Sequence, residues 1–235
     1  MMRVYFVGFG PGNPELLTVK GYNLLKEADL IIYPGSLIDE KYLEQFSGKK
    51  INSYGLKLEE IVDIIVKAVR EGKKVVRLQS GDPSIYGAIG EQIRELEKRG
   101  IEYEIVPGVS SVFASAAAIK RELTTPKAPG VIITRPKGKT LEEDYLSILA
   151  STSLTLVILL GVDKIDYIVD VVGNVRGLNE PCAVVYHASR EDEKVIVSTL
   201  GKIANEVKKA GIRRTATIII GKAVEGYKGR SILYG

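Results

Sequence analysis

Three segments of this sequence combine glycine, proline and small polar side chains in a way that suits close contact with a small ligand. They are Gly8-Phe9-Gly10-Pro11-Gly12-Asn13-Pro14, then Ser80-Gly81-Asp82-Pro83-Ser84-Ile85-Tyr86-Gly87, and then Pro107-Gly108-Val109-Ser110-Ser111. Glycine has no Cβ, so it lets backbone N–H groups approach a ligand, most readily where a helix begins. Each segment follows a predicted strand. Ligands bind outside the carboxyl ends of strands in open α/β sheets, so the segments predict a shared ligand crevice.

The first segment does not complete a common nucleotide-binding fingerprint. In the Gly-x-Gly-x-x-Gly pattern the third glycine would fall at Asn13, and no acidic residue ends the second predicted strand. A phosphate-binding loop would need Gly-Lys-Ser/Thr, which is missing. A nicotinamide oxidoreductase is therefore disfavoured. A Gly/Pro turn with a purely structural role stays open.

The polar side chains of the other segments each have two possible roles. Asp82 either caps the following helix or accepts a hydrogen bond from a ligand hydroxyl, and Ser110 or Ser111 either caps a helix or lines a pocket. His187 is the only histidine and Cys182 the only cysteine, so no clustered His/Cys metal site is predicted and both residues are interpreted as structural. There is no Gly-x-Ser-x-Gly motif either, and no catalytic residue is assigned.

Basic residues follow another predicted strand in Thr134-Arg135-Pro136-Lys137-Gly138-Lys139-Thr140. Arginine can bind a carboxylate through two parallel hydrogen bonds, so Arg135, together with Lys137, suits a substrate with several acidic side arms. Solvated surface charge is the alternative. The net charge of +4 is small and the basic residues are interspersed with acids, which argues against a nucleic-acid partner.

Strands that alternate with helices position the first three segments. The strand predictions in the first half are Val4–Val7, Leu30–Tyr33, Val75–Leu78 and Tyr103–Val106. Helices are predicted from near Glu15, between Leu58 and Val69, from Glu91 to Arg99 and from Ser110 to Ile119, with Gly72 and Gly100 as caps. This alternation is typical of a mostly parallel sheet covered by helices.

The second half predicts a separate, mixed sheet. Its strand candidates are Val131–Thr134, Leu156–Leu160, Ala183–Tyr186, Val195–Ser198 and Thr217–Ile220. The third and fourth are too close for an intervening helix, so they are expected to form a hairpin. A turn-rich segment, Thr124 to Gly130, marks a boundary. We therefore predict two α/β domains, 1–120 and 121–235. The longest apolar stretch, Leu154 to Val162, is too short to span a membrane, and a cytoplasmic location is expected.

In this order, the three segments resemble the tetrapyrrole methylases, a family of S-adenosylmethionine (SAM)-dependent enzymes with two α/β domains. The match continues to Ile218-Ile219-Ile220-Gly221. Within the family the chain is similar to the branch that methylates ring carbon 11 of precorrin-4 or cobalt-precorrin-4 in cobalamin biosynthesis. That similarity rests on Tyr33-Pro34-Gly35-Ser36-Leu37, Gly81-Asp82-Pro83-Ser84-Ile85-Tyr86-Gly87-Ala88-Ile89 with Glu91-Gln92, Glu122-Leu123-Thr124, Ile133-Thr134-Arg135 and Arg230-Ser231-Ile232-Leu233-Tyr234. The chain departs from the family at Pro129-Gly130 and at Gly138-Lys139-Thr140-Leu141.

The resemblance implies a ligand cleft between the two α/β domains, SAM as the cofactor, S-adenosylhomocysteine as its product, an anionic tetrapyrrole as the substrate, and a homodimer. The cofactor-binding positions that carry over are Pro11, Ser80, Gly81, Asp82, Ile85, Tyr86, Ser110, Ser111, Leu160 and Ala216. Methyl transfer from an activated sulfonium depends on positioning more than on acid or base groups, which agrees with the lack of a triad. Tyr86 or Asp82 is a hypothetical aid to proton loss.

Other functions stay open beside this one. A sibling methylase would act on another corrin carbon, on uroporphyrinogen III, or, as diphthine synthase, on the modified histidine of elongation factor 2. A nicotinamide oxidoreductase and a non-catalytic module that binds SAM or a tetrapyrrole are readings from different classes. The sequence leaves both cobalt-free and cobalt-carrying substrates open.

Overall fold

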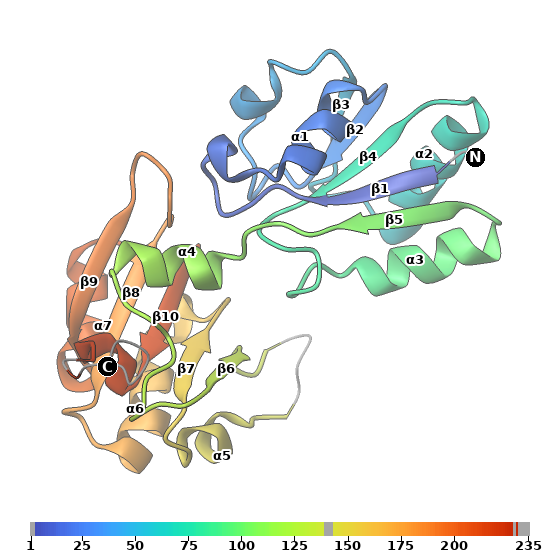
Figure 1. Cartoon of the computed structure of the whole chain (residues 1–235). Helices are drawn as coiled ribbons and strands as arrows, with labels where there is room; N and C mark the ends of the chain where they lie inside the picture. The colour runs from blue at the N-terminus through green and yellow to red at the C-terminus, as the bar shows by residue number, and fades with distance from the viewer. Residues whose placement is uncertain (1–2, 139–142, 228, 230–235) are drawn as a thin grey trace. The chain divides into compact units, whose positions relative to one another are not determined.

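The computed structural model describes residues 3–138, 143–227 and 229 (Figure 1). Contacts within the chain divide it into two compact units, Met1–Ser111 and Val112–Gly235. All of helix α4 (Ser111–Ala118) except its first residue therefore groups with the second unit, although the turn-rich segment that suggested a boundary lies after it.

The first unit contains a five-stranded sheet in the order β3-β2-β4-β1-β5. The strands are β1 (Arg3–Gly8), β2 (Leu30–Tyr33), β3 (Lys49–Asn52), β4 (Val75–Gln79) and β5 (Glu102–Val106). Every neighbouring pair is parallel, which confirms the predicted parallel sheet. The sequence missed β3, because this edge strand is half-exposed and lacks an apolar run.

Helices cover both faces of this sheet. They are α1 (Val19–Lys26), α2 (Leu58–Arg70) and α3 (Ile89–Lys98), and Figure 1 shows α3 running alongside β5. Successive side chains of a strand point to opposite faces. Val4 and Phe6 of β1 accordingly pack in the core that contains α2 and α3, whereas Val7 packs in the core that contains Leu24 and Leu25 of α1.

Neighbouring strands β1 and β4 send the chain to opposite faces of the sheet. β1 is followed by α1 on one face, and β4 is followed by α3 on the other. Such a reversal opens a crevice beyond the carboxyl ends of the two strands, and this is the usual ligand position in open α/β sheets. The first and second predicted ligand segments begin here.

The predicted helix from near Glu15 is wrong in its start. Pro14–Leu16 (η1) is a single 3-10 turn, in which the Asn13 side chain accepts a hydrogen bond from the Glu15 N–H at 2.9 Å. α1 begins at Val19, after Thr18 accepts from the Gly21 N–H at 3.1 Å. Two side-chain caps in quick succession divide what the sequence predicted as one helix.

The second unit contains a mixed sheet in the order β6-β7-β10-β8-β9. The strands are β6 (Val131–Thr134), β7 (Thr155–Ile158), β8 (Pro181–Tyr186), β9 (Lys194–Thr199) and β10 (Ala216–Ile220). Only β6 and β7 are parallel; the other pairs are antiparallel, and β8 with β9 forms the predicted hairpin. The prediction of a mixed second sheet is confirmed.

One face of the second sheet packs on three helices: α5 (Leu146–Ala150), α6 (Ile165–Arg176) and α7 (Leu200–Lys209). Three other segments are short 3-10 turns: η2 (Glu40–Leu43) in the first unit, and η3 (Val162–Lys164) and η4 (Lys222–Glu225) in the second. A hydrogen bond also attaches the segment around Leu123 to the sheet. Thr155 of β7 is fully buried and donates its hydroxyl to the Leu123 carbonyl at 2.7 Å. None of the helices in the described ranges is both long and apolar enough to cross a membrane.

Candidate functional site

The three predicted ligand segments meet at the carboxyl ends of β4, β1 and β5. The Gly81 N–H donates to the Gly10 carbonyl at 2.8 Å, and the Gly10 N–H donates to the Gly81 carbonyl at 3.2 Å. The Asp82 carboxylate reaches the third segment, where its Oδ2 accepts from the Gly108 N–H at 2.9 Å. The structure thus joins three segments that lie far apart in the sequence.

Glycines allow the three segments to pack backbone against backbone. A Cβ added to Gly108 would lie 2.4 Å from the Gly81 carbonyl oxygen and 2.8 Å from Gly8 Cα. One added to Gly8 would lie 2.6 Å from the Gly108 nitrogen. Gly81 also has a φ of +65°, in the left-handed region that favours glycine. The spacing of the loops is therefore set by direct backbone contact.

Asp82 acts as a clamp between the second and third segments. Its Oδ1 accepts from the Ser84 N–H at 2.8 Å and from the Ser84 hydroxyl, while Oδ2 accepts from Gly108. Burial raises the pKa of Asp82, but the hydrogen bonds from Ser84 and Gly108 lower the pKa by more, so it lies below its ordinary value. The helix-cap alternative is wrong, because α3 begins only at Ile89.

The remaining predicted positions of the first unit belong to the same three segments. Pro11 is buried, Ser80 and Ile85 are half-buried, Ser110 is 5% exposed, and Ser111 is the first residue of α4.

Tyr86 and Ala88 adopt left-handed backbone conformations in the second segment, with φ of 54° and 49°. Tyr86 is 43% exposed. Left-handed conformations cost energy for residues other than glycine, and they occur at ligand sites but also at His187, with a φ of 49°. The turn is therefore a candidate for ligand contact.

The predicted residues of the second unit lie at one end of its sheet. Ile218 of β10 pairs with Ile158 of β7, and continuing this antiparallel register by two residues places Ala216 opposite Leu160. Thr134 also pairs with Ile158, so Arg135 follows at the same end. Leu160 combines a left-handed φ of 52° with 64% exposure, which is an unusual arrangement for a leucine.

Lys137 has contacts within the second unit. Its Nζ lies 5.9 Å from the centre of the Tyr167 ring, and its carbonyl oxygen accepts from Lys164 Nζ. The neighbouring segment 139–142 and the segment Arg230-Ser231-Ile232-Leu233-Tyr234 lie outside the described residues.

The structural interpretation of His187 and Cys182 agrees with their surroundings. His187 Nδ1 lies 2.8 Å from Asp192 Oδ2, and its ring stacks on Tyr186 with 3.7 Å between the ring centres. Cys182 is fully buried in the core, and this burial raises the pKa of its thiol. Among the described residues no cluster of three or more His, Cys, Asp or Glu side chains could hold a metal ion.

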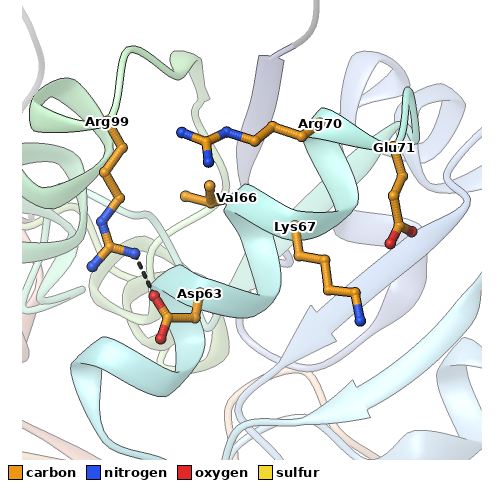
Figure 2. Close-up of a pocket in the computed structure, with 6 residues that line it drawn as sticks. All are labelled: Asp63, Val66, Lys67, Arg70, Glu71 and Arg99. Atoms are coloured by element: carbon orange, nitrogen blue, oxygen red, sulfur yellow. Dashed lines mark hydrogen bonds and ion pairs between the residues drawn. The ribbon is translucent and has the colours of Figure 1, made fainter.

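A surface depression lies between α2 and the residue that follows α3 (Figure 2). It is lined by Asp63, Val66, Lys67, Arg70, Glu71 and Arg99. α2 and α3 lead into β4 and β5, so the carboxyl ends of these helices lie near the amino ends of the strands. Figure 2 shows Arg99 bonded to Asp63, so part of its positive charge is already paired. None of the residues that line this depression belongs to the three ligand segments.

Sequence reasoning missed two buried polar residues beneath the second segment. Arg77 on β4 is 6% exposed and Gln92 on α3 is 5% exposed, and Arg77 Nε donates to Gln92 Oε1 at 3.1 Å. The signals in the sequence were a charged residue inside the apolar run Val75-Val76-Arg77-Leu78 and the presence of Gln92 in the segment that carries the family resemblance; neither indicated a contact between the two.

Comparison with known proteins shows the family to which the chain belongs. The family model described as Tetrapyrrole (Corrin/Porphyrin) Methylases matches residues 3–204. The chain belongs to the tetrapyrrole methylase family. The resemblance inferred from the three segments is confirmed, and so is the fold of two α/β units, the first parallel and the second mixed.

Three members illustrate the similarity of this tetrapyrrole methylase to its relatives. The cobalt-precorrin-4 C(11)-methyltransferase of Methanocaldococcus jannaschii is 52% identical over 240 residues, covering 99% of this chain and 92% of the relative. The X-ray structure of cobalt precorrin-4 methyltransferase, CbiF, has a TM-score of 0.92 and 38% identity, and the match covers 95% of this chain and 96% of that one. A uroporphyrin-III C-methyltransferase from Thermus thermophilus, complexed with S-adenosylhomocysteine, has a TM-score of 0.82 and 35% identity over 95% of this chain and 99% of its own.

Proposed function

We propose that this chain transfers a methyl group from SAM to carbon 11 of cobalt-precorrin-4, forming cobalt-precorrin-5 in cobalamin biosynthesis. The observation that carries the proposal is 52% identity, across 99% of the chain, to a relative named for that reaction. Similarity to the uroporphyrin-III methylase is lower, at 35%, so that substrate is the alternative.

The described residues fit SAM as the methyl donor. SAM has a charged amino-acid end and an apolar adenine, so it needs hydrogen-bonding groups beside exposed apolar surface. In the first unit the loops that follow β1, β4 and β5 offer backbone groups, serine hydroxyls and the half-exposed Tyr86 ring; we propose contacts from Pro11, Ser80, Gly81, Asp82, Ile85, Tyr86, Ser110 and Ser111. In the second unit we propose Leu160, whose exposed side chain suits an aromatic ring, and Ala216.

The chemistry of the reaction agrees with a site built for positioning. When bound, SAM supplies a methyl group already activated by its positive sulfur, and the macrocycle must release a proton after gaining it. Asp82 is a weak base because its pKa is lowered and both its oxygens accept hydrogen bonds within the loops. We therefore assign Asp82 to holding the loops, and the rate to orientation of the reactants.

Arg135 and Lys137 are the proposed partners of the substrate's carboxylate side arms. Arg135 follows β6 at the same sheet end as Leu160 and is half-buried, which favours a fixed, two-pronged contact with a carboxylate. Lys137 lies against Tyr167 and would contribute a single charge.

We also propose a homodimer located in the cytoplasm, as family membership suggests. Large apolar side chains are exposed on the second unit, among them Phe113 on α4 at 62% and Val197 on the edge strand β9 at 57%. Association of two copies would remove such side chains from water.

The test is a mass-spectrometric assay of purified protein with SAM and a panel of tetrapyrroles. The panel contains cobalt-precorrin-4, its cobalt-free counterpart, earlier and later corrin intermediates, and uroporphyrinogen III. Gain of one methyl group by cobalt-precorrin-4 alone is the expected result. Methylation of a different member would move the assignment within the family. SAM binding without any product would favour a binding module, and nicotinamide binding in place of SAM would contradict the proposal.

A further inference from the structure

Arg77 carries a buried charge that no carboxylate balances within the described part of the chain. Its side chain lies on β4, and Nη1 donates to the carbonyls of Ile32 at 3.4 Å and Leu78 at 3.3 Å. Burial lowers the pKa of the Arg77 guanidinium to about 10. None of the ion pairs found among the described residues includes Arg77. Its charge is therefore held by dipoles alone, which is a costly arrangement in a protein interior.

Gln92 links this buried charge to the surface turn that contains Tyr86. The Gln92 Oε1 atom accepts from Arg77 Nε at 3.1 Å, and its Nε2 donates to the Ala88 carbonyl at 3.2 Å. Because both ends of the amide are used, its orientation is defined. Ala88 directly precedes α3, and both Ala88 and Tyr86 have left-handed backbones. A continuous chain of hydrogen bonds thus runs from the core to this turn.

Packing alone does not explain such a chain. Apolar side chains of similar length would fill the same space between β4 and α3 without an unbalanced charge. Replacing buried charged groups by apolar side chains often leaves the stability of a protein unchanged or raises it. A fully bonded polar network does, however, select one arrangement of the backbone. Left-handed conformations at Tyr86 and Ala88 need such support, because they persist only where their surroundings hold them.

We propose that Arg77 and Gln92 are positioning residues for the methyl-donor site, which hold the Tyr86 turn in the conformation that binds SAM. They act through the Ala88 carbonyl, and the inference rests on the proposed function, since it presumes that SAM binds at this turn.

The test is the substitution Gln92→Glu. It keeps an acceptor for Arg77 and even supplies the missing carboxylate, but it removes the donor to the Ala88 carbonyl. Gln45→Glu is the matched control: Gln45 is exposed, and its Nε2 also donates to a backbone carbonyl, that of Tyr42, at 3.2 Å. For Gln92→Glu we expect about tenfold weaker SAM binding by calorimetry and a matching rise in the KM for SAM, the effect of one buried hydrogen bond. The kcat at saturating SAM, the KM for the tetrapyrrole and the thermal stability should not fall, and Gln45→Glu should change nothing.

A second variant covers the case in which a glutamate at position 92 disturbs folding. Arg77→Met combined with Gln92→Met removes both the charge and the link while keeping unbranched side chains, so the protein should unfold at no lower temperature than the wild type and still bind SAM about tenfold more weakly. Unchanged SAM affinity in a folded variant would overturn the positioning role alone. A wild-type protein that binds no SAM would overturn the proposed function as well.

Discussion

Gly108→Ala tests whether backbone contact between the three loops sets up the ligand site. Gly108 does not have a left-handed φ, so alanine can adopt its backbone conformation. The added Cβ would nevertheless lie 2.4 Å from the Gly81 carbonyl oxygen, whereas ordinary contact begins near 3.4 Å. This oxygen and the nearby Gly8 Cα are backbone atoms, so they cannot rotate aside as a side chain could. The loops after β4 and β5 must therefore separate by about 1 Å.

A separation of this size should affect both folding and binding. Overpacking a well-packed region costs about 1–3 kcal/mol, and the Asp82–Gly108 hydrogen bond would lengthen with the loops. A misplacement of about 1 Å can reduce activity by roughly a hundredfold where a reaction depends on orientation. We therefore expect SAM binding to weaken by at least roughly tenfold, with a larger loss in kcat/KM.

The assay is calorimetric titration with SAM, supported by denaturant unfolding of the same preparations. Gly90→Ala is the matched control, because Gly90 lies within α3 and a Cβ there would meet no atom within 4 Å. That change should stabilise the helix by about 0.5–1 kcal/mol and leave SAM affinity unchanged. Wild-type SAM affinity in Gly108→Ala would refute the argument, since the loops would then tolerate separation.

Three further substitutions probe individual contacts. Asp82→Asn should weaken SAM binding. The pKa of Asp82 is lowered in the folded protein, so the Asp82 charge stabilises the fold above the ordinary pKa of 3.8, and this stabilisation is lost as the pH falls through the lowered pKa. The wild type should therefore melt at a higher temperature than Asp82→Asn at neutral pH, and this difference should shrink in acid. A difference that stays constant from pH 7 to pH 3 would show that the charge does not matter. Leu160→Gly should stabilise the second unit by about 1 kcal/mol in urea unfolding, because glycine adopts the left-handed φ of this position without strain. The same change should weaken SAM binding, since it removes the exposed side chain. A loss of stability would show that the backbone at Leu160 is not strained. Arg135→Gln should raise the KM for the tetrapyrrole by about tenfold or more, as the loss of a charged hydrogen bond predicts, and leave the KM for SAM unchanged. Arg70→Gln, at the exposed depression, should change neither KM. Equal losses of affinity for both ligands would remove Arg135 from substrate binding.

The sequence by itself predicted most of the strands, the helices α2, α3 and α4, and the Gly/Pro segments that follow β1, β4 and β5, but it did not predict α5, α6 and α7. Apolar periodicity is a local property, and it located α2, α3 and nine of the ten strands that the described residues form, including the β8–β9 hairpin. The Gly/Pro segments marked where strands end, and the loop residues carried the family resemblance. Local patterns failed where local signals are weak or compete: β3 has no apolar run, and the caps at Asn13 and Thr18 divide the segment that follows β1.

Only the tertiary structure decided which of these elements meet. β1 pairs with β4 and β5 but not with β2, so the loops that meet follow β1, β4 and β5 and skip β2 and β3. The contact of Gly8, Gly81 and Gly108 and the link from Arg77 through Gln92 to Ala88 depend on that strand order. Periodicity records which face of a strand is buried, whereas strand order is selected by packing between distant segments. The same packing brings isolated polar residues into one network, which is why a lone arginine in an apolar run gave no indication of its partner.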